Sequence, residues 1–154
     1  MIRCTFIILF VFAGAAARAD DPAAKEAKKL QGEWQVVEGE RNGKKATRES
    51  AEIKDMRFVF KENELIVRLA NGNGAERKSN FKLDPAKMPT EIDITSLDGQ
   101  EKGQTTAAIY KLEKDRLTIC LPYFVKNPGD RPKEFKAGAD DGVMLIVLER
   151  VKPK

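Results

Sequence analysis

Short runs of alternating apolar and polar residues recur along most of the chain, and this pattern restricts the fold more than any other feature. The apolar positions are Trp34 and Val36; Met56, Phe58 and Phe60; Leu65, Val67 and Leu69; Phe81 and Leu83; Ile92 and Ile94; Ala107, Ile109 and Tyr110; Leu117, Ile119 and Leu121; and most of 143–148. A period of two is typical of half-buried β-strands. The sequence therefore predicts an all-β domain of about eight short strands.

The segments between these runs indicate how the strands connect. Residues 61–64, 71–74, 98–103 and 113–116 are short and polar, and most of them carry Asn, Asp or Gly, which suit hairpin turns. Because no segment is long enough for a helical crossover, consecutive strands should be spatial neighbours. We predict an antiparallel meander that closes into an up-and-down barrel over residues 32–152, with an open two-sheet sandwich as the alternative.

The first residues have the layout of a secretory signal peptide. Arg3 precedes an apolar stretch, and Ala17-Arg18-Ala19 follows it as a cleavage site. The apolar stretch is too short to cross a bilayer, so we expect cleavage after residue 19, no membrane span in the mature chain, and export to the periplasm or the extracellular space. Residues 20–31 are rich in alanine and lysine and predict an arm or a short helix.

Charge and composition exclude several functions. The net charge falls from +4 to +2 when residues 1–19 are removed, and lysines and glutamates are interspersed, which argues against nucleic-acid binding. The chain has no histidine, which removes the commonest general base and zinc ligand. Glu91 and Asp93 most simply face solvent, and Asp140-Asp141-Gly142 suits a turn. We therefore expect no enzymatic activity, no metal and no cofactor.

Three further segments carry expectations. Residues 48–55 predict one or two helical turns, as a lid over one end of the barrel. The long connection 122–142 is a candidate interaction loop with Tyr123, Arg131 and Phe135 as anchors. The last run, 143–148, is apolar on both faces, so the long connection, the N-terminal helix or a second subunit must cover its outer side. Cys120, within an apolar strand, should be a buried thiol.

Two resemblances extend this interpretation. Gly32-Glu33-Trp34, after a short helix, resembles the Gly-x-Trp signature with which lipocalins begin. That resemblance implies that Trp34 closes the base of the barrel and that a basic residue near the C-terminus, here Arg150, stacks across it. The lipocalin disulfides and second signature turn are missing.

Nearly the whole chain after residue 19 is also similar to an uncharacterised family of small exported domains known chiefly from planctomycete bacteria. The matching stretches are Leu30-Gln31-Gly32-Glu33-Trp34-Gln35-Val36-Val37, Phe81-Lys82-Leu83-Asp84-Pro85, Ile109-Tyr110-Lys111-Leu112, Leu117-Thr118-Ile119-Cys120-Leu121 and Arg131-Pro132-Lys133-Glu134-Phe135. This resemblance implies a lipocalin-like architecture and no established activity.

Two hypotheses for function follow. In the first, the barrel holds a small apolar ligand against interior residues, namely Phe58, Phe60, Leu65, Val67, Phe81 and Ile92. The same side chains could instead fill the barrel completely. In the second hypothesis, a filled barrel binds a protein or polymer of the cell envelope through the 122–142 loop.

Overall fold

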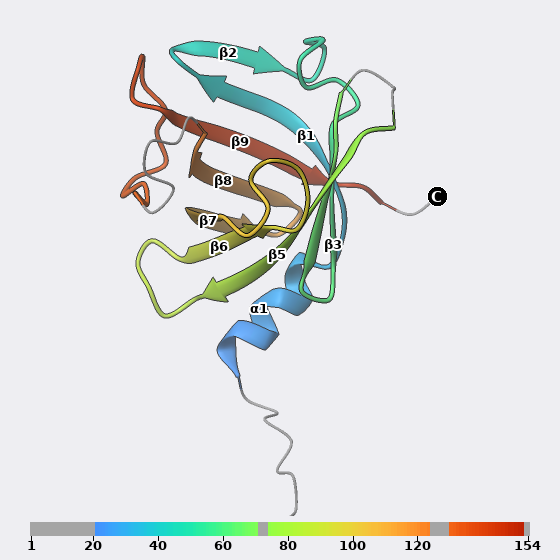
Figure 1. The fold of residues 1–154 in the computed structure, drawn as a ribbon, viewed down its shortest axis with the longest axis vertical. Coiled ribbons are helices and arrows are strands. Elements are labelled where there is room, and N and C mark those ends of the chain that lie inside the picture. The colour runs from blue at the N-terminus through green and yellow to red at the C-terminus, as the bar shows by residue number, and fades with distance from the viewer. Residues whose placement is uncertain (1–20, 71–73, 124–129, 153–154) are drawn as a thin grey trace, which may run out of the picture.

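The computed structural model describes residues 21–70, 74–123 and 130–152. Within these residues the chain forms one helix and nine strands, which Figure 1 shows. They are α1 (Pro22–Leu30), β1 (Gly32–Arg41), β2 (Lys44–Thr47), β3 (Arg57–Lys61), β4 (Glu64–Arg68), β5 (Glu76–Asp84), β6 (Glu91–Ser96), β7 (Thr105–Glu113), β8 (Arg116–Pro122) and β9 (Val143–Arg150). The proposed signal peptide lies outside the described residues.

Eight of the strands close into an antiparallel barrel. From β3 to β9 each strand pairs with the next along the chain, and β1 pairs with both β3 and β9. The closing pair runs from Trp34 opposite Arg150 to Arg41 opposite Met144. The predicted meander and its closure are therefore confirmed, and the open sandwich is excluded.

Strand β1 divides its second edge between two partners. Its first residues, from Gly32 to Gln35, pair with β3, and its last residues, from Glu38 to Arg41, pair with β2. Strand β2 extends this edge beyond the barrel wall at the top of Figure 1. Strand β2 was not predicted, although Asn42 and Gly43 both adopt positive φ in its turn and are a typical hairpin signal.

A β-bulge between Val36 and Glu38 changes which side chains of β1 face inward. The register against β9 skips Val37 at this point. Because successive strand residues face opposite sides, one extra residue reverses the alternation beyond it. Trp34 and Val36 have the inward register before the bulge, whereas Gly39 and the exposed Arg41 have it after the bulge. Without the bulge, two glutamates would take these inward positions.

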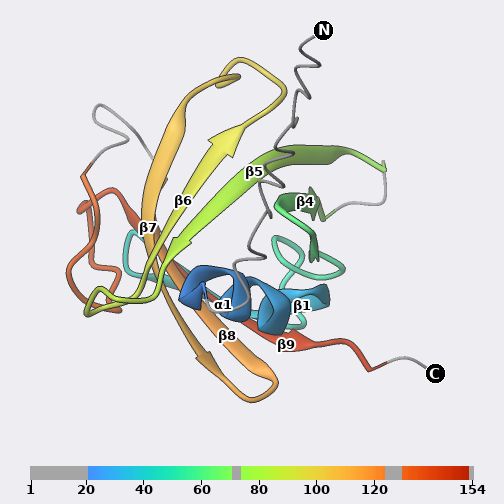
Figure 2. The ribbon, with the colours of Figure 1, turned by 90° about the horizontal axis from the view of Figure 1, so that it is seen from below.

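Helix α1 closes one end of the barrel. Asp21 caps its N-terminus by accepting a hydrogen bond from the Ala23 amide at 3.0 Å. Leu30, its last residue, is fully buried, and Ala23 and Ala27 pack against the barrel core. Figure 2 shows the helix lying across the barrel when it is seen from below. Among the described residues, no helix is long and apolar enough to cross a membrane.

Residues 48–55 connect β2 to β3 at the opposite end. The expected helical turns are present only as successive hydrogen-bonded turns, such as the bond from the Ile53 amide to the Ser50 carbonyl at 3.1 Å. The Ile53 side chain is buried and belongs to the core. This segment therefore covers part of the end of the barrel, through a single apolar side chain.

Candidate functional site

The interior near α1 is filled by side chains. Those exposed by 2 % or less include Leu30, Trp34, Phe60, Leu65, Ile92, Tyr110, Leu117, Ile119 and Leu148. A side chain with almost no accessible surface has other atoms packed against all of its sides. This half of the interior is therefore a packed core.

Five of the six predicted ligand-binding residues lie within that core. Phe58, Phe60, Leu65, Phe81 and Ile92 are exposed by at most 7 %. The rings of Phe60 and Phe81 meet edge to face, with their centroids 5.2 Å apart. The sixth residue, Val67, is half-buried and lies nearer the open end. Val67 therefore differs from the other five residues in how deeply it lies within the barrel.

A ring of half-buried apolar side chains marks the open end. Its members pack on the core from the side away from α1 and come from five different parts of the barrel wall: Met56, Val67, Ile94, Leu121 and Met144. We call this set the apolar ring. Because these side chains are neither sealed nor fully exposed, part of their apolar surface stays accessible at this end. The apolar ring is the candidate functional site.

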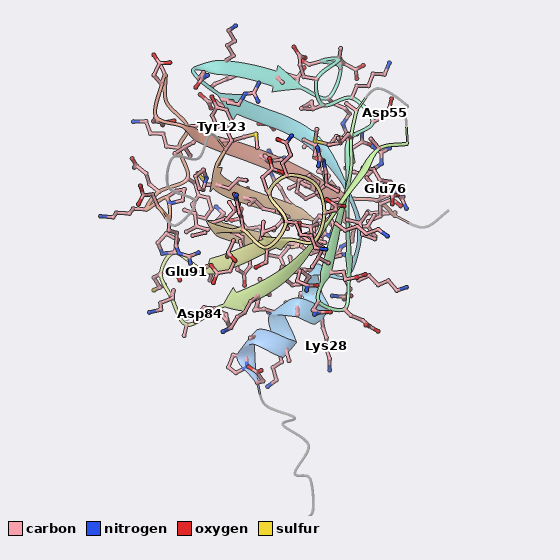
Figure 3. The ribbon with its side chains drawn as sticks, in the orientation of Figure 1. Lys28, Asp55, Glu76, Asp84, Glu91 and Tyr123 are labelled. Atoms are coloured by element: carbon pink, nitrogen blue, oxygen red, sulfur yellow. The ribbon has the colours of Figure 1, made fainter. Side chains whose placement is uncertain are left out.

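An arginine and a tyrosine stand beside the apolar ring. Arg41 pairs with Met144 in the β1–β9 register, and its Cζ lies 4.9 Å from the ring centroid of Tyr123. Tyr123 follows β8 directly, and Figure 3 shows it at the upper left, far from Lys28 of α1. Tyr123, predicted as an anchor of the interaction loop, thus lies at the rim of the barrel. Sequence reasoning missed Arg41, because its inward position depends on the bulge.

A second arginine, Arg77, has the inward register near the same end. It lies opposite Val67 and two residues before the buried Ser79. Its guanidinium lies against Gly99, so a methyl group at that glycine would collide with it, and the Glu101 carboxylate is close to the same point. The loop between β6 and β7 therefore contacts the guanidinium of Arg77.

The long connection 122–142 is attached to the outside of the barrel, and residues 124–129 of it lie outside the described residues. The Arg131 guanidinium binds the Asp93 carboxylate at 2.6 Å and the Glu91 carboxylate at 3.3 Å. It also donates to the Ala108 carbonyl at 2.5 Å. Glu91 and Asp93 lie on the outer face as predicted, with their side chains 29 % and 42 % exposed, and Arg131 bridges them there. Phe135, the third predicted anchor, is half-buried.

Cys120 lies under this attached segment. Its side chain is fully buried, and its thiol donates to the Lys136 carbonyl at 3.6 Å. Neighbouring Ala137 is also buried. Burial raises the pKa of the Cys120 thiol, and the charges of Asp141 and Glu134 add to the effect. The described part of the long connection thus covers the outer face of β8, and the thiol stays protonated.

Trp34 and Arg150 form the closure at the α1 end. The Trp34 indole nitrogen donates to the Leu30 carbonyl at 2.8 Å. Arg150 stacks on the indole with Cζ 4.1 Å from the ring centroid. The same guanidinium donates to the carbonyls of Gln31 at 2.7 Å and Lys29 at 2.6 Å, at the end of α1. One side chain therefore joins the last strand, the helix and the indole.

A hollow of about 430 Å³ lies at the same end and is an alternative site. It is lined by Glu26, Lys29, Leu112, Lys114 and Arg150. Lys29 already binds Glu26, and Arg150 binds the end of α1. A mostly charged lining suits an apolar ligand less well than the apolar ring does. In the part of the chain that the structure describes, no cluster of side chains could hold a metal ion.

One solved structure supports this architecture. A lipocalin-like protein from Bacteroides uniformis is similar in structure, with a TM-score of 0.50 and 14 % sequence identity over 80 % of this chain and 99 % of that one. An uncharacterized protein from Bacteroides eggerthii aligns with a TM-score of 0.43 and 12 % identity, over 78 % of this chain and 98 % of that one. No protein-family model matches the chain, and no curated protein matches it.

The fold is lipocalin-like. At this level of identity the likeness shows the architecture alone, and the resemblance to exported planctomycete domains stays a prediction.

Proposed function

We propose that the chain is an exported, non-enzymatic binding domain that holds the apolar part of a small molecule against the apolar ring. The observation that carries the proposal is the change in side-chain exposure along the barrel interior. Near α1 the large apolar side chains are sealed except Leu112, whereas at the opposite end five large apolar side chains are half-exposed together. Apolar surface that remains accessible at the mouth of a barrel is a common place for a small ligand.

The packed half of the interior supports a shallow site. Trp34, Phe60 and Leu65 leave no room beneath the apolar ring, so a ligand would rest on this core and would not thread through the barrel. The fold agrees with the proposal, because eight-stranded barrels hold either filling side chains or one small ligand. In this barrel, side chains would fill the interior near α1, and the ligand would bind at the opposite end.

Two neighbouring residues of β4 provide a matched test. Val67 and Ile66 are both half-buried, but Val67 faces the interior and Ile66 faces outward. We would titrate the purified protein, without residues 1–19, with the neutral apolar dye Nile red and follow its fluorescence. Val67→Gln should weaken dye binding by about tenfold, which corresponds to about 1.4 kcal/mol. Ile66→Gln should leave dye binding unchanged.

Stability measurements complete the test. Both variants should unfold at similar temperatures, because each replaces one half-buried aliphatic side chain. Equal weakening by the two variants, or no dye binding by the parent protein, would contradict the proposal. Export is tested separately by the mass of the chain recovered from the cell envelope, which should begin at Asp20.

A further inference from the structure

We propose that the ligand of the open end is an anionic amphiphile, whose tail lies on the apolar ring and whose acidic head group binds Arg41. This inference rests on the proposed function and adds the charge of the ligand to it. It starts from how the arginines of the chain are engaged.

Most arginines in the described residues have a carboxylate partner. Those with an ion pair are Arg48, Arg57, Arg68, Arg116, Arg131 and Arg150. Within residues 21–70, 74–123 and 130–152, Arg41 and Arg77 have none. A guanidinium stays charged at any physiological pH, so an arginine without a carboxylate partner presents a permanent positive charge.

Contact with the Tyr123 ring leaves Arg41 able to bind an anion. A guanidinium stacked on an aromatic ring uses its face, whereas its five N–H donors lie in its plane. That edge matches the two oxygens of a carboxylate or a phosphate. Tyr123 would therefore hold Arg41 in place while the donors point elsewhere.

The position of Arg41 fits a head group. The bulge at Val37 gives Arg41 the inward register, so its exposed side chain stands at the rim beside its register partner Met144 of the apolar ring. Glu40, the adjacent carboxylate on β1, has the outward register and lies 3.9 Å from Lys45. Lys44 lies opposite Arg41 across the hairpin and adds positive charge at the rim. Apolar surface and unneutralised positive charge thus adjoin, which is the complement of an anionic amphiphile.

Arg77 is the weaker choice for the head group. Its guanidinium lies against Gly99, and Glu101 lies close enough to offset part of its charge. The geometry therefore assigns the head group to Arg41.

Two ligands with the same tail test the inference. Decanoate and decanol differ in head-group charge, and each can be measured by displacement of Nile red. Decanoate should bind about tenfold more tightly than decanol at low ionic strength, and added salt should reduce the difference. Arg41→Gln should bring decanoate to the affinity of decanol and leave decanol unchanged. Arg41→Lys, which keeps the charge without the planar fork, should retain part of the preference.

Arg68→Gln is the control, since Arg68 adjoins Val67 on β4 but faces outward and binds Glu33 and Glu76. It should keep the full preference for decanoate. If the contact between Arg41 and Tyr123 has only a structural role, Arg41→Gln should weaken the binding of decanoate and decanol equally. That result would overturn the inference.

The remaining outcomes separate this inference from the proposed function. Equal affinity of the parent protein for decanoate and decanol would overturn the anionic head group and leave an apolar site in place. A preference that Arg77→Gln removes and Arg41→Gln retains would overturn the assignment to Arg41. Failure of every ligand, including Nile red, would overturn the proposed function as well.

Discussion

The two ends of the barrel each carry an arginine beside an aromatic ring, and the two pairs differ in what else the arginine binds. Arg150 stacks on Trp34 and also binds two helix carbonyls and the Asp115 carboxylate. Arg41 stacks on Tyr123, and no ion pair holds it within the described residues. An arginine and an aromatic ring therefore close the barrel at one end, whereas at the other end the arginine has no carboxylate partner among the described residues.

The largest expected difference concerns the two aromatic residues. Trp34→Ala removes the largest side chain of the sealed core and should lower the free energy of unfolding by about 3–5 kcal/mol. Tyr123→Ala removes a half-buried ring at the rim and should cost about 1 kcal/mol or less. Urea unfolding measures both values. It is followed by circular dichroism, because Trp34 is the only tryptophan and Trp34→Ala would remove the tryptophan fluorescence signal. Similar losses of unfolding free energy in the two variants would show that Tyr123 stabilises the fold as much as Trp34 does.

The arginines themselves give the second contrast. Arg150→Gln leaves the Lys29 and Gln31 carbonyls without their donor and should cost about 1–3 kcal/mol. Arg41→Gln should change the free energy of unfolding by no more than about 0.5 kcal/mol. The same urea experiment applies to both. A large loss in Arg41→Gln would mean that the open end is fastened by this contact.

A third arginine extends the comparison to the outer surface. Arg131 is engaged like Arg150, so Arg131→Gln should cost about 1–2 kcal/mol. The variant should also loosen the segment over Cys120, and the thiol should then react faster with a disulfide reagent. The folded parent protein should react slowly, since burial raises the pKa of the thiol and blocks access to it. Fast reaction of the parent protein would show that the segment does not cover Cys120.

The smallest expected effect concerns Tyr110 and tests whether water reaches the sealed end of the barrel. Burial raises the pKa of Tyr110 to about 12, with Glu26 and Asp84 contributing, and its hydroxyl has no hydrogen-bond partner among the described residues. At pH 7, Tyr110→Phe should therefore be neutral or slightly stabilising.

The pH dependence of stability gives a second readout for Tyr110. Because the unfolded phenol ionises near pH 10, the parent protein should lose stability between pH 10 and pH 12 relative to the variant. Unfolding experiments across that range measure the difference, and parallel curves would indicate a hydrated Tyr110.

Alternation was sufficient to predict the barrel, and it failed where strands leave the packed interior. Strand β2, with the sequence Lys-Lys-Ala-Thr, has no apolar alternation because it lies beyond the barrel wall. Strand β5 begins at Glu76, earlier than the apolar positions Phe81 and Leu83 indicate, since its first inward residues are polar. Polar inward positions resemble a loop in the sequence.

The candidate site was less predictable than the fold. Alternation identifies which residues face inward, but it does not show which end of the barrel α1 seals. Five of the predicted ligand residues therefore lie in the core, and Val67 alone belongs to the apolar ring. Arg41 was hidden by the bulge, because strict alternation from Trp34 would place Glu38 and Glu40 inward. A one-residue irregularity thus decides the charge at the rim.

The pairing of β1 with β9 has a consequence for the order in which the protein can be completed. The hydrogen bond from Arg150 to the Gln31 carbonyl joins positions 119 residues apart. Contacts over such separations form late, because a long segment of chain must be ordered first. A chain that ends before Val143 would be an open curved sheet, with β8 and β1 as unpaired edges that can join other chains. The final strand therefore removes both of these edges at once, because it pairs with β8 on one side and with β1 on the other.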